Sequence, residues 1–180
     1  MPELPEVEVL RRDLEAEVVG ATVDRAEVTG VRTVRRQEPQ ALVARLAGAR
    51  LTSTARAGKY LLVGLDGVPD VLVVHLRMSG QLILADRGDP RARHTHAVIG
   101  LADGRELRFV DPRTFGELFV ATGPPGPMGA DPLDSGWRPA DLARVLDGRQ
   151  ARLKGLLMDQ RRLAGLGNIY SDEALFAARL

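Results

Sequence analysis

The second residue of the chain has the chemistry of a nucleophile. Initiator methionine is normally removed before a small residue, which would leave the secondary amine of Pro2 at the amino terminus. A neutral amine attacks an electrophilic carbon and forms a Schiff base if its pKa leaves some free base near neutrality. Glu3 is adjacent, and a carboxyl beside the reacting atom can act as a general acid, particularly if burial raises its pKa. The same residues are also an ordinary proline-led helix start with acidic residues in its first turn.

Two lysines stand out because arginine supplies nearly all of the positive charge. Of the 25 basic residues only Lys59 and Lys154 are lysine. Arginine does not transfer protons and is shaped for forked contacts, whereas lysine is a compact charge on a flexible stem. The pattern indicates a specific role for the two lysines, and the alternative is that they are solvated surface residues.

The composition sets the class of protein. The chain has 180 residues, 44% of them hydrophobic, and no apolar run approaches membrane length, so we expect one domain plus part of another and no membrane insertion. Acidic residues replace the basic and apolar segments of a secretory signal, and cysteine is absent, which predicts a cytoplasmic protein. With a net charge of only +1, a nucleic-acid partner requires locally clustered positive charge.

A helix comes first in the predicted order of elements, and strands follow it. Val7, Leu10 and Leu14 keep helical spacing, and Gly20 ends the helix at about Val19. The apolar period then changes to two, as in strands. These elements predict an α+β fold, a β-sandwich flanked by helices. A short helix is expected near Gln40–Ala47, and the expected strands are Ala21–Val28, Arg50–Arg56, Tyr60–Leu65, Val71–Leu76, Gln81–Ala85, His96–Leu101, Glu106–Val110 and Leu118–Ala121.

A segment rich in proline and glycine divides the chain. We predict a first domain over residues 1–121, a linker over 122–136 and a helical domain over 137–180. The last predicted helix has no capping residue, glycine or proline, so its apolar face and terminal carbonyls are expected to lack partners, and the chain looks cut. The expected helices of this part are Pro139–Leu146, Arg152–Met158 and Ser171–Leu180, the last two separated by a loop at 164–168.

Five short motifs occur in order along the whole chain, and together they resemble formamidopyrimidine-DNA glycosylases. They are PELPEVE at 2–8, GKYLL at 58–62, HLRMSG at 75–80, DPRTFG at 111–116 and GLGNIYSDEALF at 165–176. The resemblance implies a β-sandwich domain, a helix-two-turn-helix domain and a carboxy-terminal zinc finger. Because the chain has no cysteine, we expect a truncated member that holds only the start of the helical domain, with no metal or cofactor within residues 1–180.

The resemblance also implies a function in base-excision DNA repair. Such a glycosylase removes oxidised purines, 8-oxoguanine and formamidopyrimidines, from duplex DNA and cleaves the abasic site by β,δ-elimination. By this resemblance Pro2 is the nucleophile at C1′, Glu3 is the acid that assists opening of the sugar ring, and Lys59 donates protons in the elimination steps. Glu6 would hold the entrance of the pocket and the helix start.

An enzyme that acts on a base must remove it from the stack and fill the gap that remains. By resemblance Met78, Arg113 and Phe115 are the inserting residues, and wedges of Met and Phe are suited to kinking a duplex. Alternatively, Met78 and Phe115 belong to the core, and Arg113 forms a salt bridge with Asp111. Placement in turn-like motifs favours exposure.

Phosphate contacts position a duplex without reading its sequence. By resemblance His75, His94, Lys154 and Asn168 bind DNA, and Arg149 lies in a basic segment that could contact phosphate. His75 could instead be a satisfied core histidine, and Arg149 a solvated charge at a helix end. His96 is expected to be structural, and the three histidines form no credible metal site.

Two features bear on the substrate. A sister branch acting on oxidised pyrimidines typically begins Pro-Glu-Gly-Pro, whereas this chain has Leu4, which favours oxidised purines. Thr114 replaces an arginine of many relatives. The expected partner is double-stranded DNA with oxidised bases or abasic sites, bound by a monomer. A noncatalytic DNA-damage binding module and a β-sandwich interaction protein are the alternatives from other classes.

Overall fold

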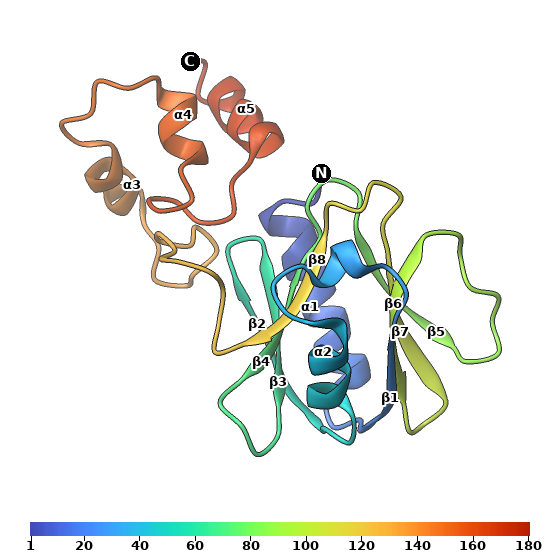
Figure 1. Cartoon of the computed structure of the whole chain (residues 1–180). Coiled ribbons are helices and arrows are strands. Elements are labelled where there is room, and N and C mark those ends of the chain that lie inside the picture. Colours follow the sequence, from blue (N-terminus) through green and yellow to red (C-terminus); the bar gives the residue numbers. More distant parts are fainter.

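The computed structural model describes all residues from 1 to 180, in two parts that Figure 1 shows side by side. The first part is a β-sandwich with helices, and the second is a group of helices reached through a long connection. One sheet has the strand order β1 (Val23–Val28), β6 (Thr95–Leu101), β7 (Arg105–Val110) and β5 (Gln81–Asp86). The other has the order β2 (Leu51–Ala57), β3 (Tyr60–Leu65), β4 (Val71–His75) and β8 (Glu117–Ala121).

Antiparallel pairing and apolar burial hold the sandwich together. Every strand pairs antiparallel with its neighbours. Helix α1 (Leu4–Val18) contributes Val7 and Leu14 to the core, and α2 (Pro39–Leu46) contributes Leu42. Phe109 of β7 is fully buried among them. This architecture confirms the predicted α+β sandwich flanked by helices.

Most predicted boundaries of the first part agree with the structure to within two residues. One element was not predicted, the 3₁₀ helix η1 (Val31–Val34). It is a single short turn, too brief to leave a periodic apolar signal. Its buried residues Thr33 and Val34 place it against the sandwich.

Three helices form the second part: α3 (Pro139–Leu146), α4 (Leu153–Met158) and α5 (Asn168–Ala177). Helix α5 begins three residues before the predicted start at Ser171. Its amino-terminal N–H groups find acceptors on a distant side chain, described below, so the helix needs no local capping residue. No helix of the molecule has the length and apolarity required to cross a membrane.

The end of α5 corrects the expectation that its carbonyls lack partners. Arg179 adopts a left-handed conformation with φ 59°. Its N–H donates to Phe176 O at 3.0 Å, and Leu180 N–H donates to Leu175 O at 3.0 Å. This pair of bonds is the Schellman motif, formed here with arginine at the position that glycine usually takes.

The connection between the two parts is anchored at its far end. Gly129 N–H donates to Gln160 O at 2.9 Å, and a short parallel bridge joins Ala130 to Leu163. Arg56, at the end of β2, adds a contact to Asp131 at 2.5 Å. Residues 122–136 contain no helix or named strand, yet these contacts fix where the helical part begins relative to the sandwich.

Candidate active site and DNA-facing rim

A cavity of about 700 Å³ lies between the two parts of the molecule. Residues of the β2–β3 turn, of β4 and of the loops after β4 and β7 form its sandwich side. The end of α4 and the loop before α5 form the opposite side. Its thirteen lining residues are Met1, Arg35, Lys59, Tyr60, His75, Arg77, Met78, Phe115, Met128, Met158, Gln160, Leu166 and Gly167.

Glu3 joins the start of the chain to the start of α5. Its side chain is completely buried and accepts N–H groups from Gly167 at 2.6 Å, Ile169 at 3.0 Å and Tyr170 at 3.3 Å. Oε2 takes two of these bonds and Oε1 takes one, so Oε1 keeps lone-pair capacity. The first turn of a helix carries unpaired N–H groups and attracts acidic side chains, which explains why this carboxyl is held here.

Glu3 and Lys59 both approach the position that a side chain on Gly167 would occupy. A Cβ built on Gly167 would lie 2.5 Å from the Glu3 carboxyl carbon and 2.5 Å from Lys59 Nζ. Sequence reasoning predicted Glu3 and Lys59 but missed Gly167. The available signal was a glycine in the place where a helix usually has Ser, Thr or Asp as its cap. Lys59 and Gly167 line the cavity, and the buried Glu3 bonds Gly167; we call these three residues the inner end of the cavity.

The β2–β3 turn positions Lys59. Gly58 has a φ of 57°, and a Cβ there would lie 3.2 Å from Gly165 N, so the turn packs directly against the helical part. Burial lowers the pKa of Lys59 from its ordinary value, and the nearby charge of Glu3 partly opposes that shift. A lysine with a lowered pKa is better able to exchange a proton near neutral pH.

Glu6 supports Glu3 from one turn further along α1. Its Oε2 accepts the Glu3 N–H at 2.9 Å, and its Oε1 accepts the Tyr170 hydroxyl at 2.8 Å. Burial acts to raise the pKa of Glu6, but these hydrogen bonds outweigh it and leave the pKa below its ordinary value. The helix start predicted for Glu6 is therefore present as a capping box, and Tyr170 is a partner that the sequence did not reveal.

Pro2 lies directly before Glu3, and Met1 lines the cavity. Loss of Met1 would therefore free the Pro2 amine within one residue of the buried carboxyl. The structure thus brings Pro2, Glu3 and Lys59, predicted from widely separated motifs, into one place.

His75 forms part of the cavity wall as a neutral ring. It is buried, and its Nδ1 accepts the Arg77 N–H at 3.0 Å, which leaves the ring proton on Nε2. Tyr60 packs edge-on with ring centroids 4.4 Å apart. Burial, reinforced by the charge of Arg77, lowers the pKa of His75 to about 4. The ring is buried, as the core alternative required, yet it also faces the cavity.

Glu117 is a buried carboxylate that sequence reasoning missed. It accepts Arg36 Nε at 2.8 Å and Arg77 Nη2 at 2.7 Å. Burial opposes its ionisation, but the two arginines outweigh burial and lower its pKa. Arg77 is thereby held at the cavity. Glu117 could not be singled out from the sequence, because it lies directly before the strand expected at Leu118–Ala121 and carries no signature of its own.

The predicted inserting residues Met78, Arg113 and Phe115 lie on two turns, and we call them the rim. Met78 is 43% exposed and Phe115 is 46% exposed, so neither belongs to the core. The Arg113 guanidinium lies 4.8 Å from the centre of the Phe115 ring. Asp111 accepts the backbone N–H of Arg113 at 3.1 Å, and no salt bridge forms between their side chains, so that alternative is wrong.

Asp111 ties the two rim turns together. Its Oδ1 accepts the Ser79 hydroxyl at 2.5 Å, from the turn that carries Met78. Its Oδ2 accepts the Gly116 N–H at 2.7 Å, from the turn that carries Phe115. Each turn contains a non-glycine residue with positive φ, Arg77 at 54° and Thr114 at 55°. Strained turns of this kind persist only where surrounding contacts fix them.

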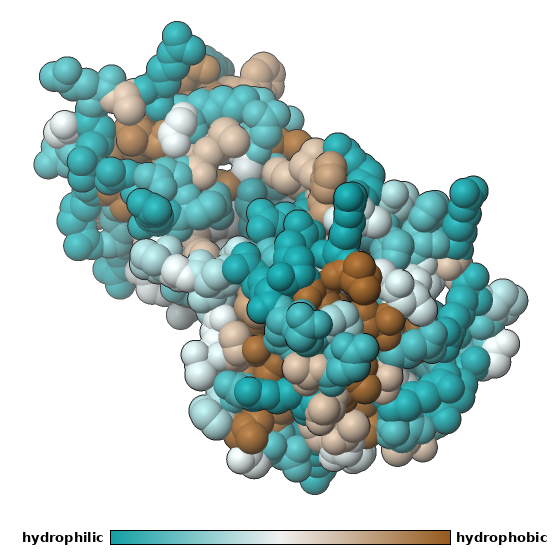
Figure 2. All heavy atoms as spheres, in the orientation of Figure 1, coloured by the Kyte–Doolittle hydropathy of each residue, from teal (hydrophilic) through white to brown (hydrophobic).

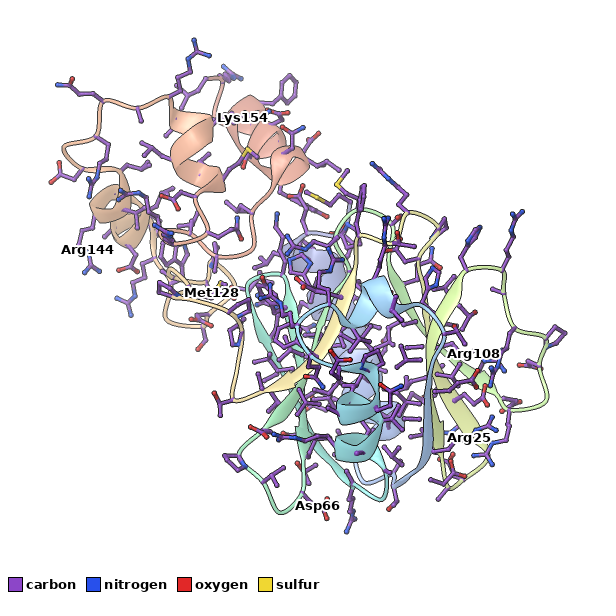
Figure 3. The ribbon with its side chains drawn as sticks, in the orientation of Figure 1. Arg25, Asp66, Arg108, Met128, Arg144 and Lys154 are labelled. Carbon is purple, nitrogen blue, oxygen red and sulfur yellow. The ribbon has the colours of Figure 1, made fainter.

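The other predicted DNA-binding residues lie outside the cavity lining. His94 is exposed with a φ of 70°, and Asn168 is exposed as the first residue of α5. Arg149 is exposed after α3. Lys154 forms an ion pair with Asp172 of α5 at 2.7 Å, and Figure 3 shows it on the helical part. His96 has a structural role, because its Nε2 bonds Asp111 O at 2.9 Å.

The zinc finger implied by the resemblance has no counterpart among these residues. Cysteine is absent, and no group of three His, Asp or Glu side chains is arranged to hold a metal ion. The residues present therefore do not fit that metal.

Comparison with known proteins agrees with this architecture. Residues 1–118 match the family described as formamidopyrimidine-DNA glycosylase N-terminal domain, and residues 128–180 match its H2TH domain. The formamidopyrimidine-DNA glycosylase of Mycolicibacterium paratuberculosis is 46% identical over all of this chain and 67% of its own length. That of Moorella thermoacetica is 45% identical over 99% of this chain and 67% of its own length.

Solved structures give the same result. A complex between the Lactococcus lactis Fpg and DNA containing an abasic site superposes with a TM-score of 0.88 at 31% identity. It covers 99% of this chain and 67% of its own. Another complex of that enzyme, with FAPY-dG containing DNA, also has a TM-score of 0.88. The chain belongs to the formamidopyrimidine-DNA glycosylase family, as the five motifs predicted, and spans about two-thirds of the length of these relatives.

Proposed function

We propose that the chain removes oxidised purines, 8-oxoguanine and formamidopyrimidines, from duplex DNA and cleaves the resulting abasic site through a Schiff base on Pro2. The observation that carries this proposal is the inner end of the cavity, where Glu3 and Lys59 both approach Gly167. Pro2 directly precedes Glu3 in the chain. A neutral amine, a carboxyl with a free lone pair and a lysine of lowered pKa are the groups that this chemistry needs.

In the proposed reaction the Pro2 amine attacks C1′ of the damaged nucleotide. The bond from C1′ to the base breaks, the base leaves with a proton, and Glu3 assists opening of the sugar ring. The iminium that remains acidifies the neighbouring sugar protons. Lys59 then exchanges protons while the 3′ and the 5′ phosphates leave by successive eliminations. None of these steps uses a metal or another cofactor.

We further propose that the rim fills the space vacated by the flipped base. Exposed Met78 and Phe115 are suited to enter between base steps, and Arg113 is suited to face the orphaned base. His75, His94, Asn168 and Arg149 would contact phosphates. Lys154 would do so only after exchanging Asp172 for a phosphate, because the two side chains are paired.

Borohydride trapping on abasic duplex DNA tests the chemistry. We expect a protein–DNA adduct whose attached peptide begins at Pro2, and an adduct on Lys59 or Lys154 would refute the assignment. Glu3→Gln should suppress base release much more than cleavage of a preformed abasic site. Glu15→Gln is the matched control, since Glu15 lies on the exposed side of the same helix.

The same assay should be run on residues 1–180 alone and on this chain followed by the carboxy-terminal third of a relative. Relatives are longer by about that third, and their additional residues would complete the DNA groove. We expect imine formation from the 180 residues at high protein concentration and faster turnover from the fusion. Full turnover by the 180 residues at physiological salt would show that the additional third is dispensable.

A further inference from the structure

Every methionine of the chain lies on the same cavity. The sequence has four, and Met1, Met78, Met128 and Met158 all line it. They come from the amino terminus, the turn after β4, the connection and the end of α4. Cysteine is absent from these 180 residues, so all of their sulfur is gathered at this site. Figure 3 shows Met128 where the chain passes between the two parts, with yellow sulfur atoms in the region between them.

Methionine side chains suit a surface that binds a flat aromatic ring. Methionine is flexible and polarisable, so it fills irregular gaps and makes favourable contacts with aromatic rings. These side chains are also open to small molecules, because Met78 is 43% exposed and Met158 is 36% exposed. Figure 2 shows apolar surface in the region between the two parts. A thioether sulfur that is open to solvent is also readily oxidised by a hydroperoxide.

We propose that the methionines of this cavity are a site of reversible oxidative modification. A hydroperoxide converts Met78 and Met158 to sulfoxides, and the modified protein has a lower affinity for duplex DNA. The consequence for DNA rests on the proposed function. In the reaction one peroxide oxygen forms a bond to sulfur while the O–O bond breaks. The sulfur loses two electrons, and the peroxide is reduced to water if it is hydrogen peroxide, or to an alcohol if it is an organic hydroperoxide.

The expected effect follows from the polarity of the product. A sulfoxide is polar and chiral, whereas the parent side chain is apolar and flexible. Burying its oxygen between base steps without a hydrogen-bond donor costs free energy, so the modified Met78 is a poor wedge. Met158 stands on the opposite side of the cavity, and its sulfoxide would add a second polar group to the same apolar space. Bound duplex should shield Met78, so oxidation would affect the free protein first.

Graded hydrogen peroxide on the 180-residue protein tests the proposal, with peptide masses locating each added oxygen. We expect sulfoxides at Met78 and Met158, and their suppression at Met78 by duplex carrying a stable abasic analogue. Affinity for that duplex, measured across a salt series, should become about tenfold weaker. Methionine sulfoxide reductases, one for each epimer, supplied with a thiol, should restore it.

A triple variant, Met78→Leu, Met128→Leu and Met158→Leu, keeps the apolar volume and removes the sulfur. Measured against its own untreated form, it should retain its DNA affinity after peroxide. An equal loss in this variant would overturn the proposal, as would full oxidation of the native protein without loss, or sulfoxide absent from the cavity. If untreated protein binds duplex but traps no imine, the proposed function fails while this comparison still stands.

Discussion

Glu3 and Met78 serve the same cavity but differ in how the fold holds them. Three backbone N–H groups surround the buried Glu3 carboxyl, and those donors lie more than 160 residues away in sequence. Met78 has no such partner, and only the backbone of its turn is fixed, through Ser79 and Asp111. Under the proposed function Glu3 is a reacting group, which must be held to a fraction of an ångström, whereas Met78 is a wedge, which must adapt to a deformed duplex. The two regions meet these opposite demands with one scaffold.

The largest effect is expected from replacing Arg56, which links three segments around the inner end of the cavity. Arg56 is 7% exposed and bonds Glu8 of α1, Asp131 of the connection and Gly58 O beside Lys59. Arg56→Ala should lower the free energy of unfolding by about 3 kcal/mol, because Asp131, which is only 13% exposed, loses its ion-pair partner, and Glu8 keeps only Arg11 and Arg12. Arg12→Ala is the control: Arg12 contacts the same Glu8 but is 71% exposed, so a loss below about 1 kcal/mol is expected. Urea unfolding measures both, and equal losses would contradict the contrast.

Gly167 tests the precision of the inner end directly. Gly167→Ala would place a Cβ 2.5 Å from both the Glu3 carboxyl and Lys59 Nζ, so one of them must move. A displacement of about 1 Å can cost about a hundredfold in rate, and we expect that loss in the rate of borohydride-trapped imine. Gly155→Ala in α4 meets no atom within 4 Å and should leave the rate unchanged. A native rate in Gly167→Ala would mean that the site is not as rigid as its contacts indicate.

His75 tests whether the rigidity expected of the inner end extends to the neighbouring wall of the cavity. Its folded-state pKa, about 4, lies below the ordinary 6.5, so between these values the unfolded chain binds more protons. Stability should therefore fall as the pH drops through this window, by roughly 2 kcal/mol between pH 7 and pH 5. In His75→Gln, which retains an acceptor for the Arg77 N–H, this contribution should vanish. Unfolding curves at the two pH values give the difference, and an unchanged slope would show that His75 does not titrate as described.

The smallest effect is expected at the rim. Asp111→Asn replaces one acceptor oxygen by an N–H₂ group and breaks a bond to Ser79 or Gly116. Imine formation should become about tenfold slower on duplex abasic DNA and change little on a single strand, which needs no unstacking. Asp103→Asn, in the exposed β6–β7 hairpin, is the control. Equal losses on both substrates would place Asp111 with the chemistry rather than the rim.

Periodicity predicted the sandwich because apolar spacing is a local property of the chain. The strand Tyr60–Leu65 and the helix Pro139–Leu146 have the bounds that were expected. The capping of α5 by Glu3 could not be predicted, since it depends on packing between opposite ends of the sequence. The left-handed conformation of Arg179 could not be predicted either, because arginine is not a residue type that indicates a positive φ.

The motifs predicted several residues that lie together in the structure, but not the contacts that connect them. Glu3, Lys59 and His75 came from separate motifs and meet at one cavity or against it. Their supporting residues Gly167, Tyr170 and Glu117 carry no chemical signature of their own, and only the folded geometry reveals them. Lys154 is a different case: the family resemblance implied a contact with DNA, and its partner in the structure is Asp172.

The bonds between Glu3 and the start of α5 also have a consequence for biosynthesis. Glu3 is translated before Tyr170, and 167 positions separate the two residues. At synthesis rates of about 5 to 20 residues per second, the amino terminus waits on the order of ten seconds or more for these partners. Throughout that interval the nascent chain carries its amine and its carboxyl without the geometry that would make them reactive together. Under the proposed function, the order of translation thus keeps the reacting groups unassembled until the start of α5 has been made.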